Sequence, residues 1–143
     1  MDLITHTLIT RKFIGKEKLT TIAGIMPDMS FYFTYPFWLA RQEGGIQRSI
    51  ETNEWPAPPT WMITFHYITH SIPVATVFAL LALMFTKQFP KKFFLAWIGH
   101  ILIDIPTHSK RQWAPQFLWP LSDYSFDGYS WGEAFMALFK KKG

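Results

Sequence analysis

The sequence predicts an all-α fold, in which one domain forms a helical bundle whose apolar helices insert into a membrane or lie on it. Three observations lead to this prediction. Hydrophobic residues make up 49% of the 143-residue chain and aromatic residues 18%, which excludes a disordered protein. The apolar segments are separated by short basic clusters. The length suits a single domain over residues 1–143, with a real core but no second domain.

The composition also limits the chemistry. The chain has no cysteine, which excludes disulfides, thiolate catalysis and cysteine-based zinc sites. Any metal would therefore be held by nitrogen and oxygen ligands. The net charge of +4 is spread over basic clusters beside apolar segments. This arrangement favours anionic membrane lipids as partners, and no nucleic acid partner is predicted.

The first helix is predicted over residues 1–10, with Asp2 as its cap and His6 among apolar residues. Because Asp2 stands where a basic region would open a signal peptide, no signal peptide is expected.

The next apolar segment, residues 19–40, is predicted to break at Pro27. Asp28 then either caps the following helix or ligates a metal. A polar loop is expected over about 41–60, where Gly44 and Gly45 occur together.

The longest apolar segment, residues 61–85, carries His66 and His70 one helical turn apart, a spacing that can present two imidazoles to one ion. The run that follows these histidines is shorter than the roughly 20 residues of a spanning helix. It reaches that length only if the histidine-bearing turn is included. The sequence therefore leaves open whether this helix spans a bilayer or lies in a core.

A turn at Lys87, Pro90, Lys91 and Lys92 is predicted to join this helix to the next one, residues 93–105. The resulting hairpin would bring the two histidines near Asp104 and His108. In a bilayer, the lysine-bearing turn is expected on the cytoplasmic side.

The strongest motif is GHILIDIPTHS, residues 99–109, in which His100 and Asp104 lie one helical turn apart on the same face. An unbroken helix would place His108 about 12 Å from His100, too far to share one ion. Pro106 is predicted to break the helix and let His108 fold back. A carboxylate in so apolar a segment is costly unless a positive charge neutralises it. The motif therefore predicts metal ligation.

An aromatic, turn-rich segment is expected over about 109–129 and could line a pocket around the predicted metal site. A short amphipathic helix is expected over 130–142.

Five motifs in order, THT, AGIMPD, HYITHS, GHILIDIPTHS and FLWPLSD, make the chain resemble the bacterial membrane-bound metal-dependent hydrolases, including their SOS-regulated inner-membrane members. The resemblance runs from His6 to about Asp123 and implies a location in the bacterial inner membrane. More distantly, the order of the ligands is similar to that of zinc-dependent phospholipase C and P1 nuclease. The match implies one set of metal ligands: His6, Asp28, His66 or His70, His100, Asp104 and His108. Because the pair that holds a third zinc is missing, one or two ions are expected, with zinc as the first choice and manganese as the alternative.

The function that follows is metal-assisted hydrolysis of a phosphate ester, with a lipid-like ester as one candidate, by an ion that lowers the pKa of water to about 7. Asp104 would bridge ions, Asp28 would ligate or act as general base, and Lys110 with Arg111 could hold the phosphate. Two alternatives remain. One is a non-enzymic membrane protein whose histidines and aspartates make structural contacts between helices. The other is a haem-binding helical protein with two axial histidines, which gives the aspartates no role.

Overall fold

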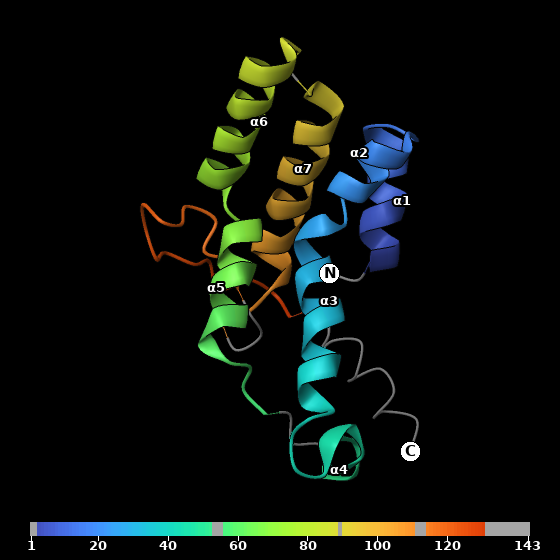
Figure 1. Ribbon diagram of the computed structural model, residues 1–143, viewed down its shortest axis with the longest axis vertical. Helices are drawn as coiled ribbons and strands as arrows, with labels where there is room; N and C mark the ends of the chain where they lie inside the picture. The colour runs from blue at the N-terminus through green and yellow to red at the C-terminus, as the bar shows by residue number, and fades with distance from the viewer. Residues whose placement is uncertain (1–2, 53–55, 89, 111–113, 131–143) are drawn as a thin grey trace.

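The computed structural model describes residues 3–52, 56–88, 90–110 and 114–130. In these ranges all regular structure is helical and no strand is present, so the all-α prediction is confirmed. The helices, shown in Figure 1, are α1 (Leu3–Phe13), α2 (Lys18–Ala23), α3 (Met26–Leu39), α4 (Gly45–Thr52), α5 (Thr60–Thr69), α6 (Ile72–Thr86) and α7 (Lys91–Thr107). Asp2, the expected cap of α1, and the helix predicted over 130–142 lie outside the described residues, except for Ser130.

Helix α7 is the element around which the others are arranged, because it packs against α1, α2, α3 and α6. It runs antiparallel to α6 in the predicted hairpin, with the lysine-bearing turn at one end of the molecule (Figure 1). Helices α3 and α5 pack together along the other half. The C-terminal half of α7 therefore lies where the two halves meet.

The sequence suggested a single helix for the long apolar segment, but the structure divides this segment into two helices. It is broken between His70 and Ser71 and bends there by 61°. Ser71 begins α6 as its N-cap, because its hydroxyl accepts a hydrogen bond from the amide of Val74, and Pro73 lies in the first turn. No single helix among the described residues is long and apolar enough to cross a bilayer, whereas α5 and α6 reach that length together across their bend.

Prolines shape two other helices differently from the prediction. Pro27 does not end a helix but lies in the first turn of α3, where its missing amide hydrogen costs nothing. The break comes earlier, at Gly24. Pro106 does not break α7, which continues to Thr107. The missing amide of Pro106 costs α7 one hydrogen bond, and the helix ends one residue later, at Thr107.

The segment 41–60, predicted as a loop, contains α4. Gly44 and Gly45 have positive φ angles of 76° and 53° and make the turn that begins this helix. Two residues further on, the Gln47 side chain donates to the carboxylate of Glu51 at 2.8 Å, an i,i+4 contact that supports the helix.

Residues 114–130 contain turns and no helix, as expected of the aromatic segment. Backbone hydrogen bonds hold this segment near both of its ends. The amide of Ile72 donates to the carbonyl of Phe117 at 2.9 Å, beside the bend between α5 and α6. Gly128 and Tyr129 donate their amides to the carbonyls of His108 and Pro106 at 2.9 and 2.8 Å. The segment therefore joins the α5–α6 bend to the end of α7.

Candidate metal centre

Five side chains from four parts of the fold meet at the C-terminal half of α7. His6 comes from α1, Asp28 from the first turn of α3, His70 from the end of α5, and His100 with Asp104 from α7. All five are buried, with 7% or less of each residue exposed. His6, Asp28, His100 and Asp104 each offer a ligand atom within 4.8 Å of the others.

Asp104 lies at the centre of this cluster. Its Oδ1 is 3.0 Å from Nε2 of His6 and its Oδ2 is 3.1 Å from Nε2 of His100. The same Oδ2 is 3.4 Å from Nε2 of His70. One carboxylate thus touches three imidazoles, each through its Nε2 atom.

Asp28 lies near the same three nitrogens, at distances equal to or longer than those of Asp104. Its Oδ1 lies 3.4 Å from Nε2 of His70 and 3.6 Å from Nε2 of His100, and its Oδ2 lies 3.8 Å from Nε2 of His6. This Oδ2 is buried and accepts no hydrogen bond from any described residue. A buried carboxylate oxygen without a donor is a ligand atom that a cation would satisfy.

Backbone carbonyls fix the orientation of two of the histidines. Nδ1 of His100 donates to the carbonyl of Gly24 at 2.8 Å, and Nδ1 of His70 donates to the carbonyl of His66 at 2.9 Å. A carbonyl oxygen only accepts, so Nδ1 carries a proton in both rings. Without an ion, Nε2 can donate to the carboxylate oxygens beside it, and a metal ion would take the place of that proton. The two Nε2 atoms nevertheless face each other at 3.3 Å. This is the usual orientation of metal-bound histidines, whose other nitrogen donates to a carbonyl or carboxylate.

The spacing of the ligand atoms fits a divalent transition metal. Bonds of about 2.0–2.1 Å at tetrahedral angles separate neighbouring ligand atoms by about 3.3 Å. The nitrogen–oxygen separations between these imidazoles and carboxylates run from 3.0 to 3.8 Å, on both sides of that value. Imidazole with carboxylate is a donor set that suits zinc and related ions. The residues present therefore fit such an ion.

The pKa values of the histidines in the cluster shift in different directions. Burial lowers the pKa of His6 and so favours its neutral, metal-binding form. Burial alone would raise the pKa of Asp28, but contacts with the imidazoles of His100 and His70 lower it overall and keep the carboxylate ionised. Burial alone would lower the pKa of His70 and His100, but contacts with Asp104 and Asp28 raise both, that of His100 to about 9, so these two rings hold protons more tightly when no ion is bound. A divalent cation would displace such protons and balance the charge of the two carboxylates.

The sequence matches the YdjM inner membrane protein family over residues 7–139, nearly the whole chain. The chain belongs to this family. Membership places it in the bacterial inner membrane, as the sequence analysis expected. No curated protein and no solved structure matches it. The YdjM match thus gives the location and a family, and the chemistry has to be argued from the cluster itself.

Two histidines that the sequence analysis placed in the ligand set lie at the edge of the cluster in this YdjM protein. His108, the C-cap of α7, approaches Oδ1 of Asp104 to 3.5 Å with its Nδ1, which also lies 3.1 Å from the carbonyl of the same residue. The ring of His66 packs on that of His70, with 4.0 Å between their centroids. Of the pair His66 and His70, the structure therefore points His70 at the carboxylates.

The capping role considered for Asp28 is wrong, because Ile25 is the N-cap of α3 and makes no side-chain cap. Supporting contacts were also missed. Thr69 lies behind His70, with its hydroxyl 3.1 Å from the carbonyl of Pro27, and Trp97 donates its indole N–H to the carbonyl of Thr69 at 2.7 Å. The carbonyl of Gly24 orients His100. These are backbone acceptors, which no side-chain motif reveals.

Proposed function

We propose that this inner membrane protein is a metal-dependent hydrolase that binds one or two zinc-class ions at the cluster and acts on a phosphate ester. The observation that carries the proposal is the convergence of three imidazole Nε2 atoms on two carboxylates. His6, His70 and His100 supply the nitrogens, and Asp28 and Asp104 supply the oxygens. An ion in such a site lowers the pKa of water to about 7 and stabilises negative charge on a phosphoryl group.

The two carboxylates suit different tasks. Asp104 is almost fully buried and contacts three imidazoles, so it would hold and bridge ions. The side chain of Asp28 is 10% exposed, whereas that of Asp104 is 1% exposed. Asp28 is the carboxylate that could accept a proton from water. His108, whose side chain is 20% exposed, lies on the other accessible edge.

The substrate class is argued from what surrounds the cluster. Lys110 is exposed two residues after His108, and its amide is held at 2.8 Å by the carboxylate of Asp127 in the aromatic segment. Its proximity in sequence to His108 makes Lys110 a candidate for contacting a phosphate. The location in the inner membrane and the aromatic residues of the segment 114–130 favour a lipid-like phosphoester.

The burial of the cluster supports a second candidate, a structural metal centre without catalysis. Structural zinc sites are closed by protein ligands, whereas catalytic sites keep one position open. His70 and Asp104 have no exposed surface, which suits a closed site. In this case the ion would only join α1, α3, α5 and α7.

Elemental analysis and a phosphoester assay test both candidates. The detergent-purified protein is compared with Asp104→Asn and with Asp123→Asn, the same change at an exposed aspartate. We expect one or two zinc-class ions per chain in the wild type and in Asp123→Asn, and loss of the metal in Asp104→Asn. Metal-dependent hydrolysis of phosphodiesters, lost in Asp28→Asn, supports the hydrolase. Metal without hydrolysis of soluble or lipid phosphoesters supports the structural centre. A wild type that takes up neither zinc nor manganese excludes both.

A further inference from the structure

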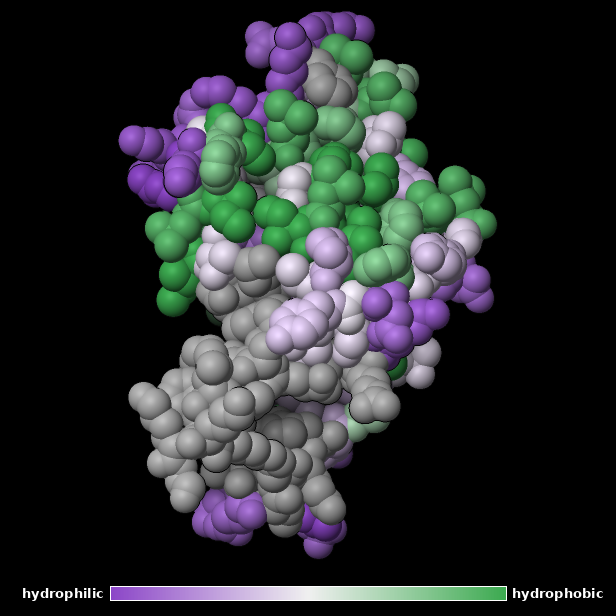
Figure 2. Space-filling view, turned by 180° about the vertical axis from the view of Figure 1, so that it is seen from behind, coloured by the Kyte–Doolittle hydropathy of each residue, from purple (hydrophilic) through white to green (hydrophobic). Residues whose placement is uncertain are grey.

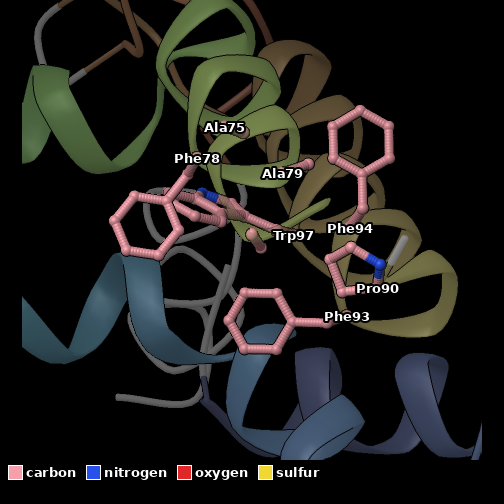
Figure 3. A pocket seen from close by; sticks show the side chains of 8 residues that line it. Ala75, Phe78, Ala79, Pro90, Phe93, Phe94 and Trp97 are labelled. Atoms are coloured by element: carbon pink, nitrogen blue, oxygen red, sulfur yellow. The ribbon is translucent and has the colours of Figure 1, made fainter. Parts of the chain in front are cut away.

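An apolar groove lies between α6 and α7, in the half of the hairpin next to its lysine-bearing turn. Its volume is about 200 Å³ and no polar atom is exposed in it. Figure 3 shows aromatic rings of α7 around this space, with small residues on the facing side of α6. The α6 wall is formed by Ala75, Phe78, Ala79 and Ala82, and the α7 side by Pro90, Phe93, Phe94 and Trp97.

The groove exists because three of the four α6 residues that line it are alanines, whose side chains fill little space, while the fourth, Phe78, packs edge-to-face against Trp97. Protein interiors are otherwise closely packed, and an apolar space of this kind gains nothing from water. Pockets for drug-sized ligands measure about 300–1,000 Å³. A groove of about 200 Å³ therefore suits part of a ligand, such as a single hydrocarbon chain.

The surface around the groove shows where such a chain would come from. Large apolar side chains of α6 are exposed: Val77 56%, Phe78 59%, Leu80 50%, Leu81 44%, Met84 65% and Phe85 82%. Figure 2 shows apolar residues gathered over the half of the molecule that carries the hairpin, bordered by hydrophilic residues at its end. In a protein of the inner membrane, a surface of this kind faces lipid.

The end of the hairpin carries positive charge. Lys87 and Lys91 are exposed on either side of the turn. Lys92 pairs with Glu17, which brings the turn between α1 and α2, with Lys16, to the same end of the molecule. From this end the groove extends along α7 from Pro90 to Trp97, roughly 10 Å at the rise of a helix. Cations at the mouth of an apolar groove match a phosphate attached to an acyl chain.

We propose that this groove binds one acyl chain of an anionic phospholipid from the bilayer, while Lys87 and Lys91 hold its phosphate. The proposal rests on the membrane location and on the hairpin, and it is independent of the metal centre. It assigns to the hairpin a lipid site with a preference for negative headgroups.

Native mass spectrometry of the detergent-purified full chain tests the groove, with phosphatidylglycerol and phosphatidylcholine as probes. We expect the wild type to retain one phosphatidylglycerol. Ala79→Leu fills the groove and should weaken this binding about tenfold or more, since each methylene that loses its burial costs a factor of about four. Val77→Leu, a change on the exposed side of α6, is the control and should bind as the wild type does. If Ala79→Leu loses its helical circular dichroism, Ala82→Leu replaces it.

The headgroup preference is tested separately with Lys87→Gln and Lys91→Gln. Each change should weaken phosphatidylglycerol binding about fivefold and leave phosphatidylcholine binding unaltered. Arg41→Gln, beyond the far end of α3, is the matched control. Three results would overturn the proposal: equal retention of both lipids by the wild type, unchanged binding in both alanine variants, or a protein dimer that these variants dissociate. The last result would mean that a second copy of the chain covers the groove.

Discussion

At the scale of single residues, the cluster is built from groups that are costly to bury separately and acceptable together. Asp104 has no exposed surface, and a lone carboxylate there would be strongly destabilising. Three Nε2 atoms lie within 3.4 Å of it, and two of the rings are held in place by backbone carbonyls. The side chains are thus oriented before any ion arrives, which is the arrangement that metal binding requires.

The first prediction separates the two histidines that the sequence alone could not. His70→Phe removes an Nε2 that faces both carboxylates and should abolish metal binding. His66→Phe leaves the carbonyl that orients His70 and keeps an aromatic ring against it, so it should retain the metal, with its affinity lowered by at most about 10–100-fold. Elemental analysis and zinc titration of both variants measure this difference. Loss of the metal in His66→Phe and its retention in His70→Phe would reverse the assignment.

At the scale of helices, composition and turn residues were sufficient for the all-α class and for the α6–α7 hairpin, because lysines and Pro90 mark the turn plainly. They were insufficient for the bend at His70. Pro73 and the hydroxyl of Ser71 signal the start of a helix, but the unbroken apolar run concealed them. Prolines were also ambiguous. Pro27 is tolerated because it lies in the first turn of α3, where no amide hydrogen is needed, whereas Pro106 lies inside α7 one residue before its end and costs the helix a hydrogen bond without breaking it.

The composition of the cluster was predictable in part. His100 and Asp104 lie one turn apart on a single helix, so local geometry brings them together. The contact between His6 and Asp104 joins residues 98 positions apart and depends on how α1 packs against α7. Nothing in the local sequence determines that packing. The motifs therefore named the candidates, and only the fold showed which of them face one another.

The second prediction concerns the junction between the aromatic segment and α7. A Cβ at Gly128 would lie 2.5 Å from the carbonyl oxygen of Pro106 and 2.8 Å from that of His108, so the backbone would have to move. Gly128→Ala should detach this segment and lower the free energy of unfolding by about 1–3 kcal/mol. Faster hydrogen exchange at the amides of Gly128 and Tyr129 reports the detachment.

Gly99→Ala is the control for this prediction. A Cβ there meets only the end of the Ile14 side chain, at 3.3 Å, and alanine favours the helix. This variant should be as stable as the wild type or slightly more so. If the amides of residues 128 and 129 still exchange slowly in Gly128→Ala, the segment is not held by its close approach to α7.

At the scale of the whole molecule, the cluster connects helices that share little apolar core. One buried apolar group joins α3 to α5 through Tyr35, Leu39 and Met62, and another joins α6 to α7 through Ala75, Trp97 and Ile101. Between these two groups lie the imidazoles and carboxylates. A metal ion there would link α1, α3, α5 and α7 at one point, and its binding free energy would add to the stability of the fold.

The third prediction follows from this linkage. A chelator should lower the thermal unfolding midpoint of the wild type, because a ligand present at about 1,000 times its dissociation constant contributes about 4 kcal/mol to the folded state. Circular dichroism of the protein in detergent, with and without chelator, measures the shift, and added zinc should restore the midpoint. Asp104→Asn should unfold at the same temperature in both conditions, since it has no ion to lose. A wild type whose midpoint does not respond to a chelator, although elemental analysis shows metal, would place that metal away from the cluster. Stability would then come from contacts among the imidazoles and carboxylates alone, as in the non-enzymic interpretation of the sequence.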